Sequence, residues 1–134
     1  MATTATGGRS GRSALDDGSF AVDMVRPDAA ATGDKTGVNP EQLFAVGYAA
    51  CFHSALQAVA RAGKVDVADS AVGSRVHIGP KDGGGYQLAV ELEVTLPHLD
   101  TEAAQQLADQ AHEVCPYSNA TRGNIDVTVT VTQD

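Results

Sequence analysis

Strict alternation of apolar and polar residues is the clearest pattern along the chain. Residues 86–95 carry Tyr, Leu or Val at every second position, and residues 70–78 alternate around Val72 and Val76. A period of two is typical of a strand with one buried face. The glycine-rich segment 79–85 between them indicates a turn, so the two segments predict a β-hairpin. Residues 125–131 alternate in the same way and predict a further strand.

A nearly continuous apolar stretch from Leu43 to Ala60 predicts a long helix that ends at Gly63. Just before it, Asn39 is a good N-cap and Pro40 is favoured as the first helical residue. A helix that is apolar almost all round must be buried on most of its sides. A single domain of 134 residues has little volume for this, so we expect a second subunit to cover one face.

The remaining segments complete an order of ββαββαβ in a single domain over residues 1–134. Strands are predicted over residues 3–6 and 20–25, on either side of a glycine-rich turn. A second helix is predicted over residues 101–115, with Pro116 ending it. Loops are predicted over residues 27–38 and after Pro116. This order indicates an α+β fold in which antiparallel pairing is favoured over a doubly wound sheet.

The charge and composition exclude several classes of function. The formal net charge is −8, from nine Lys and Arg against 17 Asp and Glu, and no basic stripe is visible. A chain of this kind is a poor binder of nucleic acid or of an anionic membrane. We expect no apolar run of the roughly 20 residues that span a bilayer. The N-terminus lacks the layout of a signal peptide, so the cytoplasm is the expected location.

Cys51 and Cys115 are the chain's two cysteines, and they lie far apart in the sequence. In a reducing cytoplasm a cysteine pair is more often catalytic, redox-sensing or metal-binding than structural. A metal is not expected, because there is no CxxC and the four histidines lack ligand spacing. Composition alone leaves two inert buried thiols and a redox pair as equal alternatives.

The helical position of each cysteine suggests a different role for it. The helix dipole acts within the first turn, and Cys51 lies beyond that turn. Burial alone raises the pKa of a thiol. Cys51 is therefore either a small core residue or a nucleophile that needs a cation from elsewhere. Arg9, in a glycine-bracketed turn, could be that cation or a solvated loop charge. Cys115, at a helix end beside Pro116, can move more easily, which suits a resolving cysteine.

Glu41 complements the start of the first helix, and it could also hold Arg9. Along one straight helix Glu41 and Cys51 are about 15 Å apart, so they cannot share a site within one chain. Two copies of this helix, packed antiparallel across a two-fold axis, would bring Glu41 of one subunit near Cys51 of the other. Arg9 could then be held by Glu41 while it faces the thiolate.

Two long motifs resemble a known family. Residues 39–44 (NPEQLF) with 47–52 (GYAACF), and residues 114–126 (VCPYSNATRGNID), are similar to the organic hydroperoxide resistance proteins, the Ohr branch of the Ohr/OsmC family. Residues 5–12 (ATGGRSGR) and 88–94 share the similarity, which covers essentially the whole chain. Each long motif has its cysteine in register, so the resemblance is specific.

The resemblance implies an OsmC-like fold, with antiparallel sheets around buried central helices, in an intertwined homodimer with active sites at the subunit interface. It implies that Cys51 is the peroxidatic cysteine, that Cys115 resolves it as a disulfide, and that an Arg9–Glu41 pair polarises the thiolate. It further implies a peroxidase for alkyl and fatty-acid hydroperoxides with no bound cofactor. The reductant would be a dithiol, such as the dihydrolipoyl group of a lipoylated partner protein.

Aromatic residues near the two motifs are candidates for a substrate pocket. Phe44, Phe52 and Tyr117 would favour alkyl peroxides over hydrogen peroxide. His53 follows Cys51 directly, and adjacent residues on a helix do not face each other, so we assign it no catalytic role. The alternatives are an OsmC-like peroxidase with another reductant, and a non-enzymatic dimer that binds hydrophobic ligands or senses oxidation.

Overall fold

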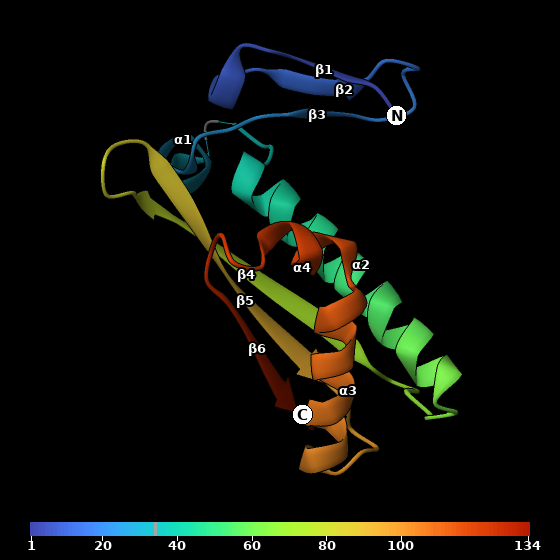
Figure 1. The fold of residues 1–134 in the computed structure, drawn as a ribbon. Helices are drawn as coiled ribbons and strands as arrows, with labels where there is room; N and C mark the ends of the chain where they lie inside the picture. Colours follow the sequence, from blue (N-terminus) through green and yellow to red (C-terminus); the bar gives the residue numbers. More distant parts are fainter. Residues whose placement is uncertain (34) are drawn as a thin grey trace. The chain divides into compact units, whose positions relative to one another are not determined.

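The structure, a computed structural model, describes residues 1–33 and 35–134 (Figure 1). These residues form two compact units, Met1–Leu43 and Phe44–Asp134, and each unit has its own three-stranded sheet. The prediction that residues 1–134 form one domain stays a prediction. The α+β fold class is confirmed.

The first unit is a small antiparallel sheet in the order β1-β2-β3. Its strands are β1 (Thr3–Thr6), β2 (Arg12–Leu15) and β3 (Ala21–Asp23), and a 3₁₀ turn, η1 (Gly8–Ser10), joins the first two. A short helix, α1 (Pro27–Thr32), follows β3.

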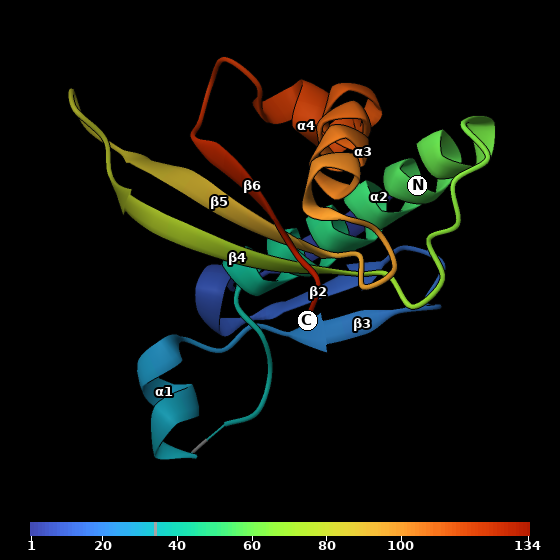
Figure 2. The same cartoon turned by 90° about the horizontal axis from the view of Figure 1, so that it is seen from below.

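The second unit contains the long helix and the larger sheet. α2 (Pro40–Ala62) begins in the first unit and continues into the second. The sheet has the order β4-β5-β6. Its strands are β4 (Ala71–Pro80), β5 (Tyr86–Thr95) and β6 (Val127–Thr132), and the helices α3 (Thr101–Val114) and α4 (Pro116–Thr121) lie between β5 and β6 in the chain. Figure 2 shows α3 and α4 on one side of this sheet.

The hydrophobic core lies in the second unit, between α2, α3 and β5. Successive turns of α2 bury Tyr48, Phe52 and Leu56 completely. The alternation predicted for β5 is confirmed, because Val90, Leu92 and Val94 are buried whereas the glutamates between them are exposed. Helix α3 contributes a stripe of small and aliphatic residues, namely Ala104, Leu107, Ala108 and Ala111.

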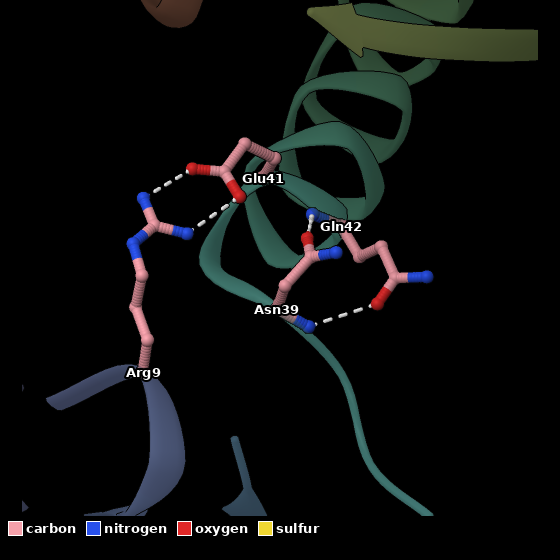
Figure 3. A network of polar contacts seen from close by, with 4 residues as sticks. All are labelled: Arg9, Asn39, Glu41 and Gln42. Carbon is pink, nitrogen blue, oxygen red and sulfur yellow. Dashed lines mark hydrogen bonds and ion pairs between the residues drawn. The ribbon is translucent and has the colours of Figure 1, made fainter. Parts of the chain in front are cut away.

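The predicted start of α2 is confirmed in detail. The side chain of Asn39 accepts a hydrogen bond from the Gln42 N–H at 2.8 Å, and the side chain of Gln42 accepts one from the Asn39 N–H at 2.8 Å. This reciprocal capping box satisfies two main-chain donors that a helix start would otherwise leave free (Figure 3). Because α2 carries both Glu41 and Cys51, the cap fixes the start of the helix that presents them.

Two predicted loops contain helices. Pro27 and Asp28 begin α1 within the predicted loop 27–38, of which residue 34 lies outside the described residues. Pro116 does not only end α3; it is also the first residue of α4. Proline fits the first helical position because its missing N–H would have no partner there. Both helices are shorter than two turns, so their hydrophobic periodicity is too brief to recognise.

The strand pairing also differs from the expected antiparallel arrangement in part. β4 and β5 form the predicted antiparallel hairpin, with Val76 opposite Val90. β6 pairs with β5 in parallel, with Val90 opposite Val127. The helices α3 and α4 carry the chain back across the sheet, and such a crossover makes the next strand parallel. In the first unit, β2 is an additional strand that the glycine-rich pattern concealed.

The expectation that no apolar segment reaches membrane-spanning length is wrong for α2. This helix has 23 residues and is long and apolar enough to cross a membrane, judged by length and composition only. The core helix of a soluble protein passes the same test. Tyr48, Phe52 and Leu56 are fully buried against the rest of the second unit. The buried face of α2 therefore packs in the core, while 28% of the apolar 18-residue window within the helix is buried as a whole.

Candidate active site

The structure brings the two cysteines together. The Cys115 thiol donates a hydrogen bond to Cys51 with a Sγ–Sγ distance of 3.6 Å, although α2 and the α3–α4 junction are far apart in the sequence. Both are free thiols; Cys51 is partly buried and Cys115 is fully buried. A disulfide needs the two sulfurs to approach to about 2.05 Å, so a shift of about 1.5 Å would join them.

Cys115 lies at the junction of two helices. It caps the C-terminus of α3 and the N-terminus of α4, with an extended backbone (φ −64°, ψ 124°). Its N–H donates to the Ala111 carbonyl at 2.9 Å, and its carbonyl accepts from the Asn119 N–H at 2.9 Å. The main chain is therefore held on both sides, and rotation of the side chain is the simplest way for its sulfur to approach Cys51.

The surroundings of Cys51 do not activate its thiol. Burial raises the pKa of Cys51, the Tyr117 N–H lowers it by hydrogen bonding to the sulfur, and the neighbouring Cys115 raises it again. The net effect is a pKa above the ordinary value, which favours the thiol over the nucleophilic thiolate. To act as a nucleophile, Cys51 would therefore need a cation from elsewhere, and its role as nucleophile or core residue stays a prediction.

A buried hydroxyl network fastens α4 to α2 beside the cysteines. The Tyr48 hydroxyl lies 2.8 Å from the Ser118 Oγ and 3.1 Å from the Thr121 Oγ1. Ser118 is also 2.8 Å from His112 Nδ1 on α3. Burial lowers the pKa of His112, with Arg122 adding to the effect, so the neutral imidazole is favoured. The three helices that carry Cys51 and Cys115 are thus linked by polar contacts inside the core.

Tyr117 connects the thiol to an aromatic cluster. Its ring packs against Phe44 and Tyr48, with centroid distances of 6.1 and 5.7 Å. Gly47 on α2 makes room for it, because a Cβ at that position would lie 3.1 Å from the Tyr117 hydroxyl. The ring therefore lies over the face of α2 one turn before Cys51, while the main-chain N–H of the same residue bonds the Cys51 sulfur.

A cavity of about 550 Å³ adjoins this cluster. Two of the three predicted pocket residues, Phe44 and Tyr117, line it. Phe52 does not: its ring is fully buried in the core, 6.4 Å from the His112 ring. Phe44 and Cys51 are seven residues apart on α2, which places them on the same face two turns apart.

Arg9 and Glu41 form a bidentate ion pair within the first unit (Figure 3). Arg9 donates from Nη1 to Glu41 Oε2 at 2.9 Å and from Nη2 to Oε1 at 2.6 Å. The Glu41 side chain is 14% exposed and that of Arg9 47% exposed. The Arg9 hydrogen bonds hold the pKa of Glu41 below its ordinary value, and Glu41 raises that of Arg9. Both charges are therefore fixed at neutral pH.

The turn that presents Arg9 depends on a close main-chain approach. A Cβ on Gly11 would lie 1.8 Å from the Thr6 carbonyl oxygen, so only glycine fits there. Gly7, directly before η1, has φ 76°, a conformation that glycine adopts at little cost. These residues bend the chain between β1 and β2 so that Arg9 reaches the start of α2.

Two pairs of the predicted site residues are therefore in contact, Arg9 with Glu41 and Cys51 with Cys115. Sequence reasoning missed the hydroxyl network, although Tyr48 was the one aromatic hydroxyl in the apolar helix. His53, to which we assigned no catalytic role, lies 3.0 Å from the Ser70 Oγ. Among the described residues no group of three or more His, Cys, Asp and Glu could hold a metal ion.

Comparison with known proteins gives the same family as the motifs. The model of the OsmC-like protein family matches residues 32–130. The organic hydroperoxide resistance protein OhrB of Bacillus subtilis is 48% identical over 92% of this chain and 90% of its own length. The organic hydroperoxide resistance protein of Xanthomonas axonopodis pv. citri is 47% identical over 96% of this chain and 90% of its own length.

Solved structures share the fold over nearly the whole chain. The crystal structure of Bacillus subtilis OhrB superposes with a TM-score of 0.90, covering 98% of this chain and 96% of that one. The crystal structure of an organic hydroperoxide resistance protein from Elizabethkingia anophelis is 43% identical in sequence. It superposes with a TM-score of 0.85, covering 98% of this chain and 94% of that one. On this similarity of sequence and fold, the chain belongs to the OsmC-like protein family and, within it, to the organic hydroperoxide resistance proteins.

Proposed function

We propose that this protein is a cysteine-based peroxidase that reduces organic hydroperoxides to alcohols and so protects against organic peroxide stress. The observation that carries the proposal is the 3.6 Å approach of the Cys51 and Cys115 sulfurs. Tyr117, whose N–H bonds the Cys51 sulfur, also lines a largely apolar cavity. Relatives that are nearly half identical over nearly the whole chain are named organic hydroperoxide resistance proteins, which supports the choice of substrate.

In the first step the Cys51 thiolate attacks the terminal oxygen of the hydroperoxide. A sulfur–oxygen bond forms as the oxygen–oxygen bond breaks, and the alkoxide takes a proton and leaves as the alcohol. Cys51 is oxidised to a sulfenic acid. Cys51 is the better candidate for this role because it is partly exposed, whereas Cys115 is fully buried.

In the second step Cys115 attacks the Cys51 sulfur. The sulfur–sulfur bond forms, the sulfur–oxygen bond breaks, and hydroxide leaves with a proton as water. The position of Cys115 at the α3–α4 junction supports this role, since only a small movement is needed. An external dithiol then attacks the disulfide, restores both thiols and is itself oxidised to a disulfide.

Arg9, held by Glu41, is proposed to stabilise the Cys51 thiolate. The thiol has a raised pKa in its own surroundings, so a cation must favour the charged form. Arginine suits this task because it stays charged and its planar fork can bind a carboxylate while it faces a second group. We propose a homodimer in which α2 helices packed antiparallel bring the Arg9–Glu41 pair of one subunit to Cys51 of the other.

The apolar cavity is proposed to hold the organic part of the hydroperoxide. Phe44 and Tyr117 supply aromatic walls, and Tyr117 also contacts the Cys51 sulfur through its N–H. Such a cavity gains from burying an alkyl or aryl group, and hydrogen peroxide offers none. We therefore propose alkyl and fatty-acid hydroperoxides as substrates.

The reductant and the location complete the proposal. We propose that a dihydrolipoyl group on a partner protein reduces the Cys51–Cys115 disulfide, that no bound cofactor takes part, and that the protein acts in the cytoplasm. The excess of acidic residues supports the absence of a nucleic-acid or anionic-membrane partner.

Steady-state kinetics test the function directly. Cumene hydroperoxide, tert-butyl hydroperoxide and hydrogen peroxide are each supplied with dihydrolipoamide and, in parallel, with thioredoxin and its reductase. We expect sustained consumption of the two organic peroxides, a much lower kcat/KM for hydrogen peroxide, and faster turnover with dihydrolipoamide. Equal kcat/KM for all three peroxides would contradict the proposal that the cavity binds the organic group. Absence of sustained turnover would contradict the proposal that the protein is a peroxidase.

A further inference from the structure

Among the described residues that line the cavity in the second unit, a single one is charged. Lys81 is that residue, and no carboxylate is among the described residues that line the cavity. The apolar and aromatic part of the lining consists of Phe44, Tyr86, Leu88, Tyr117, Ala120 and Ile125. The charge of this wall is therefore opposite in sign to the formal net charge of −8 on the whole chain.

Hydrogen bonds hold the main chain of Lys81 in place. It lies in the turn between β4 and β5, where its N–H donates to the Gly85 carbonyl at 3.0 Å and its carbonyl accepts from the Gly84 N–H at 3.0 Å. This turn forms the tip of the long hairpin (Figure 1). The residue is exposed, and its ammonium group makes no ion pair within residues 1–33 and 35–134.

A cation beside an apolar wall suits an amphipathic anion. The apolar lining removes a hydrocarbon chain from water, and an exposed ammonium group at the same cavity attracts a carboxylate. The formal net charge of −8 disfavours anions in general, so a cation at the cavity wall favours an anion at that wall over uncharged or cationic ligands. Tyr117 connects the two ends, since its ring lines the cavity and its N–H bonds the Cys51 sulfur.

We propose that Lys81 is a specificity-determining residue that binds the carboxylate of a free fatty-acid hydroperoxide whose chain occupies this cavity. The inference rests on the proposed peroxidase function and deepens it. It separates two forms of oxidised lipid, because a fatty acid that is esterified in a glycerolipid has no free carboxylate for Lys81. The chain would then favour free fatty-acid hydroperoxides over their esters.

The size of the preference follows from the exposure of Lys81. Ion pairs at exposed positions contribute modestly, so we expect the acid to gain about fivefold in kcat/KM over an ester of the same chain, mainly through KM. Salt screens exposed charges, so the preference should shrink as the ionic strength rises. The rate of the chemical step should stay the same, because Lys81 would not touch the reacting oxygens.

The test compares a C18 fatty-acid hydroperoxide with its methyl ester and with cumene hydroperoxide, all in one nonionic detergent. The variants are Lys81→Met, Lys81→Arg and, as a matched control for loss of charge, Lys64→Met, whose residue is exposed and does not line the cavity. We expect Lys81→Met to lower kcat/KM about fivefold for the acid alone. Lys81→Arg should retain the preference, and Lys64→Met should leave all three values unchanged.

A binding measurement separates this inference from the proposed function. The Cys51→Ser protein is titrated with the parent C18 fatty acid and its methyl ester, neither of which carries a peroxide. Tighter binding of the acid that is lost in Lys81→Met supports the inference. Equal binding of acid and ester, or equal kinetic losses for both in Lys81→Met, overturns it. If the wild type consumes no hydroperoxide, the proposed function fails while the titration still decides the role of Lys81.

Discussion

The hydroxyl of Tyr48 lies 2.8 Å from that of Ser118, and both residues are fully buried. Tyr48 is one turn before Cys51 on α2, and Ser118 is one turn after Cys115 on α4. This contact therefore fastens α2, which carries Cys51, to α4, whose N-cap is Cys115. It helps to explain why sulfurs so far apart in the sequence approach within 3.6 Å.

Replacing Tyr48 by Phe should loosen this connection. The hydroxyls of Ser118 and Thr121 would each lose a partner inside the core, which should lower the free energy of unfolding by about 1 to 2 kcal/mol. Formation of the disulfide should slow, and more Cys51 should be oxidised to sulfinic acid under excess peroxide. Urea unfolding and mass spectrometry measure the two effects.

Tyr86→Phe is the matched control for that substitution. Tyr86 is 76% exposed, and its hydroxyl makes no hydrogen bond within the described part of the chain. Tyr86→Phe should keep the wild-type stability. Tyr86 lines the proposed substrate cavity, so only the step from sulfenic acid to disulfide is compared, and its rate should match that of the wild type. A Tyr48→Phe variant that also matched the wild type in both would show that the contact does not position the cysteines.

Removing the charge of Arg9 should make Cys51 less reactive. In Arg9→Gln the pKa of Cys51 should rise, because the thiolate loses its proposed cation. Turnover should fall on the order of a hundredfold, as is usual for one preorganised charge partner. The pH dependence of Cys51 alkylation by iodoacetamide, measured in a Cys115→Ser background, reports the shift.

Arg12→Gln controls for the loss of an arginine ion pair in the same unit. Arg12 binds Asp23 at 2.7 Å, and both side chains are more than half exposed. Its alkylation profile should match that of the wild type. If the pH profile of Cys51 alkylation shifted equally in Arg9→Gln and Arg12→Gln, the shift would reflect only the loss of one positive charge. Arg9 would then have no specific contact with the Cys51 thiolate.

The two cysteine variants should fail in different ways. Cys51→Ser should abolish turnover, since no nucleophile remains to accept the oxygen. Cys115→Ser should still consume one equivalent of hydroperoxide, after which Cys51 remains a sulfenic acid or oxidises further. Single-turnover peroxide consumption distinguishes them, and a fully active Cys115→Ser would remove the resolving role.

Stability should fall as His112 takes up a proton. Burial lowers the pKa of His112 in the folded chain, so below the ordinary value near 6.5 the unfolded chain binds more protons. Stability then decreases as the pH falls through that range. Urea unfolding at pH 7.5 and 5.5 should show a smaller loss in His112→Gln than in the wild type; an equal loss in both would assign the effect to other groups.

Local signals in the sequence predicted much of the second unit. The cap at Asn39 and the apolar stretch after it gave the start of α2 correctly, because both depend on neighbouring residues alone. The alternation around Val90 gave β5 and its buried face for the same reason. Cys115 was expected in the last turn of α3 and is found one residue beyond it, as the cap.

The remaining features depend on contacts that a linear pattern does not contain. The parallel pairing of β6 follows from the crossover through α3 and α4 and not from the alternation of β6 itself. A proline after a helix can precede a loop or begin a second helix. Pro116 begins a second helix, and only the residues after it decide between the two outcomes. The approach of Cys51 to Cys115 was implied by the family motifs, whereas their spacing left them as equally plausible inert thiols.

The proposed mechanism requires that Cys51 and Cys115 form one disulfide during the reaction. The reduced protein is treated with one equivalent of cumene hydroperoxide, digested without reductant and mapped by mass spectrometry. We expect a peptide pair joined through Cys51 and Cys115, which disappears after dihydrolipoamide is added. Recovery of Cys115 as a free thiol, with Cys51 either unchanged or carrying only added oxygen, would contradict the proposed mechanism.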